Sequence, residues 1–228
     1  KRYDGSFGAD NRGTKFNGPF QINAGISSNT LLKNYERIGF QSVLASNTNE
    51  LKFFSGFYEQ PISSEGTKLF FSGSFSDSEP GSDLELFEIK GESKTFTLKI
   101  THSFIRSRSE NMNGFISYTN RDSETEILEK LDSEDRLRIV KLGVSYDFVD
   151  GYQGVNLLSF NLSKGVDFFN GTETGSPNLT RANGHSDFTK FTGEALRLQQ
   201  LAPSWILLGT FSWQYSFERL LASEAFGV

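Results

Sequence analysis

Apolar and polar residues alternate with a period of two over many short segments of this chain. Phe96, Leu98 and Ile100 alternate with threonines and a lysine, and over residues 205–217 one parity is aromatic or aliphatic while the other is Ser, Thr or Gln. Because successive side chains of a β-strand point to opposite faces, this period predicts strands with one apolar face. Similar stripes cover residues 20–26, 69–75, 112–118, 142–148 and 158–162.

Weaker strands are predicted at residues 2–8, 36–45, 51–58 and 188–201. The total is roughly eleven strands of about ten residues, the length that a tilted strand needs to cross a bilayer. Residues 47–49 and 150–154 are turn-sized connections, whereas 77–93, 122–135 and 167–187 are long and polar. We expect short and long connections at opposite ends of an up-and-down meander. Residues 123–135 would form a charged helix in an alternative interpretation, but a solvated loop is favoured.

Two all-β architectures fit such strands. In a soluble β-sandwich the apolar stripes form a core about 10 Å thick, and in an antiparallel transmembrane β-barrel they face lipid while the polar parity faces a wet lumen. Strand length, the aromatic ends of the 205–217 stripe and the connection lengths favour one barrel domain over residues 1–228. The predicted pore-lining residues are Lys68, Ser72, Lys99, Thr101, Lys141, Asp147, Asn161 and Gln214, and the predicted lipid-facing residues are Phe96, Leu98, Ile100, Trp205, Phe211, Trp213 and Tyr215.

Composition agrees with β structure, because the chain has 23 Phe and 22 Gly but one Met and five Pro. No apolar stretch is long enough for a membrane-spanning helix, and the mean hydropathy of −0.40 suits a barrel with polar loops. The net charge of −5 has no basic block, which argues against a nucleic-acid partner. The chain has no cysteine and hence no disulfide. Nothing at Lys1 resembles a signal peptide, so we expect a longer precursor.

Candidate chemistry is sparse. His102 and His185 have no second ligand at metal-binding spacing, and no hydrolase or nucleotide-binding motif occurs. We therefore expect no enzymatic activity, no metal and no cofactor. Glycosylation sequons at Asn161, Asn170 and Asn178 are interpreted as chance triplets, the first inside a predicted strand.

Short motifs, in order and spacing, resemble those of the two-partner-secretion transporters of the haemolysin secretion/activation type. Asp10-Asn11-Arg12-Gly13 resembles the family's opening strand and turn, and His102 to Ser107 is similar to its Tyr-Pro-Leu-x-Arg-Ser element, with Ser and Phe in place of Pro and Leu. The stretch from Ser223 to Val228 resembles the approach to the family's Val-Arg-Gly-Tyr loop. The positions that carry these motifs are Asn11, Gly13, Tyr58, Pro61, Gly66, Arg106, Gly165, Arg197, Gln199 and Phe226.

The resemblance implies about eleven strands of a roughly sixteen-strand monomeric barrel in outer-membrane lipid. Periplasmic domains would precede Lys1, and the arginine loop and the closing strands would follow Val228. It also implies a pore that passively secretes a large partner exoprotein of the adhesin or haemolysin type. A general diffusion porin and a soluble β-sandwich adhesion or carbohydrate-binding module remain the alternatives.

Overall fold

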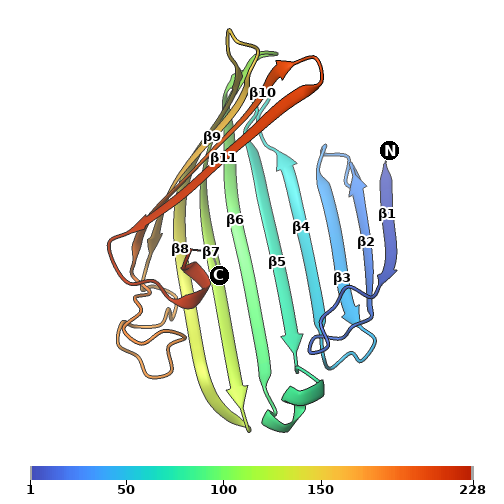
Figure 1. Cartoon of the computed structure of the whole chain (residues 1–228), viewed down its shortest axis with the longest axis vertical. Helices are drawn as coiled ribbons and strands as arrows, with labels where there is room; N and C mark the ends of the chain where they lie inside the picture. Colours follow the sequence, from blue (N-terminus) through green and yellow to red (C-terminus); the bar gives the residue numbers. More distant parts are fainter. Residues whose placement is uncertain (1, 227–228) are drawn as a thin grey trace.

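A computed structural model describes residues 2–226 as one antiparallel sheet of eleven strands, each paired with its neighbours in sequence (Figure 1). Two short 3-10 helices accompany the sheet, and neither has the length or the apolar character of a membrane-crossing helix within the described residues. The elements are β1 (Tyr3–Asp10), β2 (Gln21–Asn29), β3 (Arg37–Ala45), β4 (Lys52–Pro61), β5 (Lys68–Ser78), η1 (Ser82–Phe87), β6 (Lys90–Arg106), β7 (Glu110–Ile127), β8 (Lys130–Val149), β9 (Val155–Gly165), β10 (Thr189–Ala202), β11 (Trp205–Ser216) and η2 (Ala222–Glu224).

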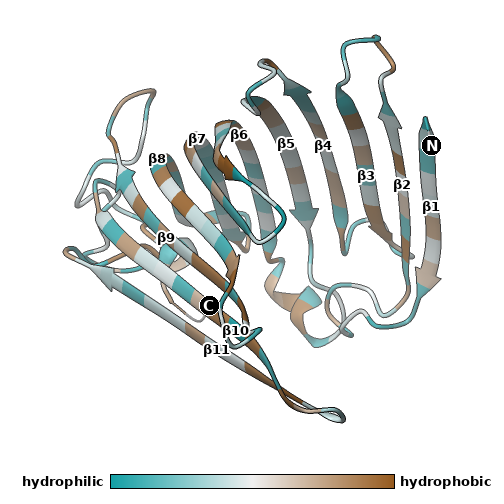
Figure 2. Ribbon diagram, turned by 90° about the horizontal axis from the view of Figure 1, so that it is seen from above, coloured by the Kyte–Doolittle hydropathy of each residue, from teal (hydrophilic) through white to brown (hydrophobic). Residues whose placement is uncertain are grey.

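The sheet is curved, and its two faces are therefore different. Strands β9 to β11 bend towards the viewer in Figure 1, and the arc is seen from above in Figure 2. The C-terminal turn η2 lies on the concave side, where Glu224 contacts Arg121 and Lys190. We call this side the inner face and the convex side the outer face. Within the described residues, β1 and β11 each pair with a single neighbouring strand, so they form the two edges of the sheet.

The strand register carries the apolar parity from strand to strand along the middle of the outer face. Ile100 pairs with Ile116, Ile116 with Leu142, and Leu142 with Leu162, in a row across β6 to β9. Paired residues point to the same face, so the predicted stripes join into one apolar surface. Alternating bands of apolar and polar residues are visible along the strands in Figure 2.

No second layer covers that surface in the part of the chain that the structure describes. Phe96 is 46% exposed and Phe211 64% exposed, although both belong to the apolar stripes. A soluble β-sandwich would pack these stripes against a second sheet, whereas all eleven strands here belong to one sheet. At about 25 cal/mol per Å² of apolar area, such a face is strongly disfavoured in water. The fold is therefore an all-β open sheet and not a sandwich.

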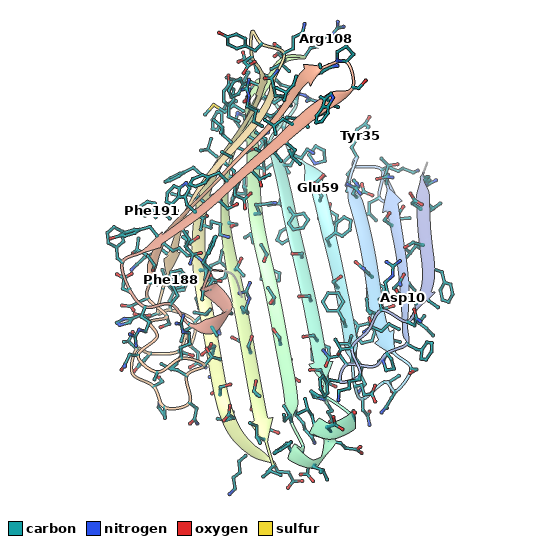
Figure 3. All side chains as sticks on the ribbon, in the orientation of Figure 1. Asp10, Tyr35, Glu59, Arg108, Phe188 and Phe191 are labelled. Carbon is teal, nitrogen blue, oxygen red and sulfur yellow. The ribbon has the colours of Figure 1, made fainter. Side chains whose placement is uncertain are left out.

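The connections differ between the two ends of the strands. One end has only short connections, at residues 30–36, 62–67, 107–109, 150–154 and 203–204. The other end has connections at residues 11–20, 46–51, 79–89, 128–129 and 166–188. We call these the short-connection end and the long-connection end; Tyr35 and Arg108 lie at the first in Figure 3 and Asp10 at the second. The turn at 47–49 was expected at the end opposite the long loops, and this expectation was wrong. The turn follows β3 and the long loops follow other odd-numbered strands, so all of them lie at the same end of the sheet.

The long polar loop predicted at residues 122–135 is also wrong, and so is the alternative helix there. β7 continues to Ile127 and β8 begins at Lys130, with only residues 128–129 between them. The register places Asp122 beside Lys94 on one side and Arg136 on the other, and Arg138 donates to the Asp122 carboxylate at 2.5 Å. Such cross-strand charge pairs stabilise polar strands. β6, β7 and β8 thus have 17, 18 and 20 residues, longer than expected.

The connection at 166–188 covers the edge of this extension. β9 ends at Gly165, so residues 130–138 of β8 pair with β7 on one side and with no strand on the other. The amide of Glu134 donates to the carbonyl of Asn178 at 2.7 Å, and the amide of Thr172 donates to the carbonyl of Arg136 at 2.9 Å. The loop therefore satisfies backbone groups that would otherwise form an open edge.

At the short-connection end, Asp150 organises the turn between β8 and β9. Its carboxylate accepts hydrogen bonds from the Arg197 guanidinium at 2.5 Å, from the Asn156 amide at 3.2 Å, and from the backbone amides of Tyr152 and Gly154 at 3.0 Å each. The Arg197 hydrogen bond, aided by those of Asn156 and the backbone, lowers the pKa of Asp150 to about 2 against the opposing effect of desolvation. The turn is thus tied to β10.

We predict that this turn holds its conformation down to unusually low pH. A carboxyl whose folded pKa is depressed contributes stability above its unfolded pKa, near 3.9, and loses it as the pH falls through the folded pKa. The amide resonances of Tyr152 and Gly154 should therefore titrate with a midpoint near pH 2. In Arg197→Gln the midpoint should rise towards the ordinary value of 3.8. An unchanged midpoint in that variant would show that Arg197 does not hold the carboxylate.

Candidate functional site

The inner face is the candidate functional site, because the register gathers the polar parity of the strands there. Lys68 pairs with Thr101, and Asn161 pairs with Thr192, which in turn pairs with Gln214. All of the residues predicted to line a pore share this face: Lys68, Ser72, Lys99, Thr101, Lys141, Asp147, Asn161 and Gln214. All of those predicted to face lipid share the outer face: Phe96, Leu98, Ile100, Trp205, Phe211, Trp213 and Tyr215.

Short polar side chains on the inner face hydrogen-bond across neighbouring strands. The hydroxyls of Thr97 and Thr119 lie 3.2 Å apart, and Ser103 donates to Asn113 at 2.7 Å. Towards the short-connection end, the Asn111 amide donates to the Asp147 carboxylate at 2.8 Å. Cross-strand pairs of this kind stabilise a sheet while keeping the side chains close to its surface. The wall therefore presents hydroxyl, amide and charged groups to the space that it encloses.

A charged cluster lies on this wall where η2 meets it. Arg121 of β7 donates to the Glu224 carboxylate at 3.1 Å, and Lys190 of β10 forms an ion pair with the other carboxylate oxygen. Lys190 also donates to the Glu224 carbonyl at 3.1 Å, and only 7% of this lysine is exposed. Lys141 of β8 lies within electrostatic range of the same carboxylate. Glu224 thus supplies the negative charge among three cations of the inner wall.

An apolar cluster holds the same C-terminal segment beside its ion pairs. Leu220 and Leu221 are buried together with Leu137 and Ile139 of β8 and with Phe188, which is labelled in Figure 3. Burying a leucine side chain fully is worth about 1.5–3 kcal/mol. Backbone hydrogen bonds add to this, because the amide of His185 donates to the carbonyl of Arg219 at 2.8 Å. Residues 217–226, which we call the C-terminal segment, are therefore fixed against the inner wall.

Sequence reasoning gave only part of this arrangement. The motif at 223–228 was expected to approach the family's Val-Arg-Gly-Tyr loop, and Glu224 to Phe226 do follow a segment held on the inner face. Gly227 and Val228, the last two residues of that motif, lie outside the described residues. The pairing of Glu224 with Arg121 and Lys190 was missed, since these residues are far apart in the sequence.

An aromatic cluster on the inner face was also missed. Phe57, Phe70 and Phe115 share the face of Lys99. The alternation over residues 68–76 places Phe70 with Lys68 and the serines, but no aromatic contacts between strands were expected on that face. A signal was present in the neighbouring pairs 57–58 and 70–71. Two consecutive aromatic residues in a strand must point to opposite faces, so one of each pair faces inward.

The family-motif positions lie at both rims and do not form one site. Tyr58, Pro61, Gly66, Arg106, Arg197 and Gln199 lie towards the short-connection end, whereas Asn11, Gly13 and Gly165 lie towards the long-connection end and Phe226 follows η2. Arg197 and Gln199 do meet, at 2.6 Å between guanidinium and amide oxygen. Position 165 needs glycine for a steric reason, because a Cβ there would lie 1.7 Å from the carbonyl oxygen of Ser186.

We predict that Glu224→Gln releases the C-terminal segment from the wall. Removing one partner of a buried ion pair leaves uncompensated charge, which is strongly destabilising. A thiol introduced by Ala222→Cys should react with a water-soluble maleimide at least about tenfold faster in that background, equivalent to about 1.4 kcal/mol. Glu173→Gln, at an exposed loop carboxylate, is the matched control and should leave the rate unchanged. Equal rates in both variants would mean that the leucines alone hold the segment.

Comparison with known proteins agrees with this architecture. The family model described as "Haemolysin secretion/activation protein ShlB/FhaC/HecB" matches residues 1–228. CdiB from Escherichia coli superposes with a TM-score of 0.83 at 19% identity, over 97% of this chain and 42% of that chain. CdiB from Acinetobacter baumannii superposes with a TM-score of 0.63 at 15% identity, over 96% and 39%. No curated protein matches the sequence.

These comparisons confirm the resemblance that the motifs indicated, and with it the all-β fold. The chain spans less than half of the length of either CdiB structure. At such low identity the structural likeness shows the fold alone, whereas the family model covers the entire sequence. The chain therefore belongs to the haemolysin secretion/activation family ShlB/FhaC/HecB of Gram-negative outer-membrane proteins.

Proposed function

We propose that this chain forms most of the wall of an outer-membrane pore that secretes a large partner exoprotein. The observation that carries the proposal is the separation of the two faces: one row across β6 to β9 reads Ile100, Ile116, Leu142 and Leu162, and the adjacent row reads Lys99, Ser117, Lys141 and Ser163. A single layer with one apolar and one polar face suits a boundary between lipid and water.

In this proposal the outer face contacts outer-membrane lipid and the inner face lines the lumen. The short-connection end faces the periplasm and the long-connection end faces the exterior, as is usual for outer-membrane barrels. The barrel is a monomer. Since lipid cannot satisfy the free backbone groups of β1 and β11, further strands of the same protein close it between these edges.

Transport involves no chemical step by the chain. An unfolded polypeptide carries unpaired amide groups, each of which costs several kcal/mol to transfer into hydrocarbon. The hydroxyls, amides and cations of the inner wall replace water for these groups and so lower the barrier. Folding of the exoprotein outside the cell supplies free energy that drives its transport. The family description favours a secreted protein of the haemolysin type as the substrate, and the resemblance of the motifs adds the adhesin type.

The proposal predicts that blocking the inner face stops secretion and that blocking the outer face does not. Lys99 and Leu98 are neighbours on β6 and point to opposite faces, and this segment has no native cysteine. In the full-length protein with its exoprotein, a bulky water-soluble maleimide should stop secretion in Lys99→Cys. Leu98→Cys, at a lipid-facing position, is the matched control and should secrete at the untreated rate.

Two results would count against the proposal in different ways. If treated Lys99→Cys secretes normally but takes up small solutes more slowly, the protein is a diffusion porin. If secretion is normal and small-solute uptake is also unchanged, Lys99 does not face a conducting lumen.

A further inference from the structure

We infer that three phenylalanines on the inner face form a contact site for the apolar side chains of a polypeptide in transit; this inference rests on the proposed function. Phe57 of β4 stacks on Phe70 of β5 with ring centroids 6.2 Å apart and an angle of 18°. The ammonium of Lys99 lies 5.0 Å from the Phe70 ring and 5.9 Å from the ring of Phe115 on β7. We call Phe57, Phe70, Lys99 and Phe115 the aromatic strip.

The aromatic strip is continuous across neighbouring strands. The register pairs Phe70 with Lys99 and Thr101 with Phe115, and the Arg37 guanidinium lies 5.7 Å from the Phe57 ring at the far end. Cations over ring faces and stacked rings are both attractive arrangements. The strip therefore crosses β4 to β7 as one band of phenyl faces, with Lys99 within it and Arg37 of β3 beside one end.

A hollow adjoins the strip at Phe57. It has a volume of about 390 Å³ and includes Ser6, Gly25, Ser27, Gln41 and Ser55 beside Phe57 in its lining. These residues lie on the inner face of β1 to β4. The wall thus offers an aromatic surface next to a space that accommodates a side chain.

Two of the rings also cover glycines, and the third does not. A Cβ at Gly39 would lie 2.3 Å from the Phe57 ring, and a Cβ at Gly143 would lie 2.2 Å from the Phe115 ring, so these rings cover glycines. Phe70 pairs instead with Glu59 and Lys99. The following inner positions of β5 are Ser72, Ser74 and Ser76, so Phe70 interrupts a serine wall. Phe70 is half-buried, and the part of its ring that stays open to a wet lumen gains free energy when an apolar group contacts it.

An extended polypeptide fits these properties. It presents side chains of mixed chemistry, and phenyl faces accept apolar, aromatic and cationic groups without requiring a defined sequence. The strip is a narrow band, so only a few residues of the passing chain touch it at one time. Contacts that are favourable but weak allow entry and release, as conduction through a pore requires.

The test places a photo-crosslinking benzoylphenylalanine at single positions of β5 in the full-length transporter, with an exoprotein arrested in transit by a tightly folded C-terminal domain. Phe70 is the strip position, Ser74 is an inner-face position outside the strip, and Phe71 faces outward. We expect the crosslink to the exoprotein to be strongest at Phe70, weaker at Ser74 and absent at Phe71. Equal crosslinking yields at Phe70 and Ser74 would contradict the proposed contact site without contradicting the proposed pore. A crosslink at Phe71 with none at the inner positions would contradict the proposed function itself.

A second measurement follows the rate of secretion. Phe70→Ser should slow it roughly 2- to 10-fold, the loss expected for one aromatic contact, and Phe70→Trp should restore it. The heat-dependent electrophoretic shift of the barrel reports whether each variant has folded. If Phe70→Ser folds and secretes at the wild-type rate, the strip is not a transit contact. If it fails to fold, Phe70→Trp and the crosslinker at Phe70, which both keep an aromatic ring, decide the question.

Discussion

The backbone hydrogen-bond ladder between neighbouring strands is the interaction on which the other features of this chain depend. In a meander each strand pairs only with its neighbours in sequence, so the register of one pair is passed to the next. A slip of one residue would turn every side chain of a strand to the opposite face. The ladder shifts register only near residues 103–105, 125–126 and 200–202 of the described strands, close to their ends. Because it is otherwise in phase from β1 to β11, an apolar surface and a polar surface arise from a sequence of modest hydropathy. The proposed membrane contact and the proposed transport both depend on that phase.

Where the ladder ends, the chain uses other groups to satisfy or cover it. The connection at 166–188 pairs with the edge of β8 beyond Gly165. The C-terminal segment lies on the inner wall by means of Leu220, Leu221 and Glu224 rather than by extending the sheet. The edges of β1 and β11 have no such cover within the described residues, which is why the proposed pore needs further strands. The charged cluster and the aromatic strip then divide the inner wall, with cations on β7, β8 and β10 and phenyl rings on β4, β5 and β7.

Much of the fold could be predicted from the sequence, because a period of two is a local signal. The stripes at 96–100 and 205–217 predict both that a strand forms there and which of its side chains share a face. The hairpin at 122–135 could not be predicted in this way, since its strands are polar on both faces and its turn has Leu128 and Glu129, which both adopt positive φ, instead of glycine or asparagine. What stabilises it is the pairing of Asp122 with residues of β6 and β8, a relation between distant positions. The inner aromatic strip could not be predicted for a similar reason: the alternation places Phe70 with the serines of β5, but only the register between strands brings Phe70 beside Phe57 and Lys99.

The most direct test of the central claim is a scan of one strand by electron paramagnetic resonance. Nitroxide labels are attached to single cysteines at each of positions 96–101 of β6 in the full-length protein in lipid, and their relaxation by oxygen, which concentrates in lipid, and by a water-soluble nickel chelate is measured. We predict maxima for oxygen at Phe96, Leu98 and Ile100 and maxima for the chelate at Thr97, Lys99 and Thr101, in opposite phase with a period of two. Low accessibility to both reagents at the apolar positions, as in a packed protein core, would contradict the account.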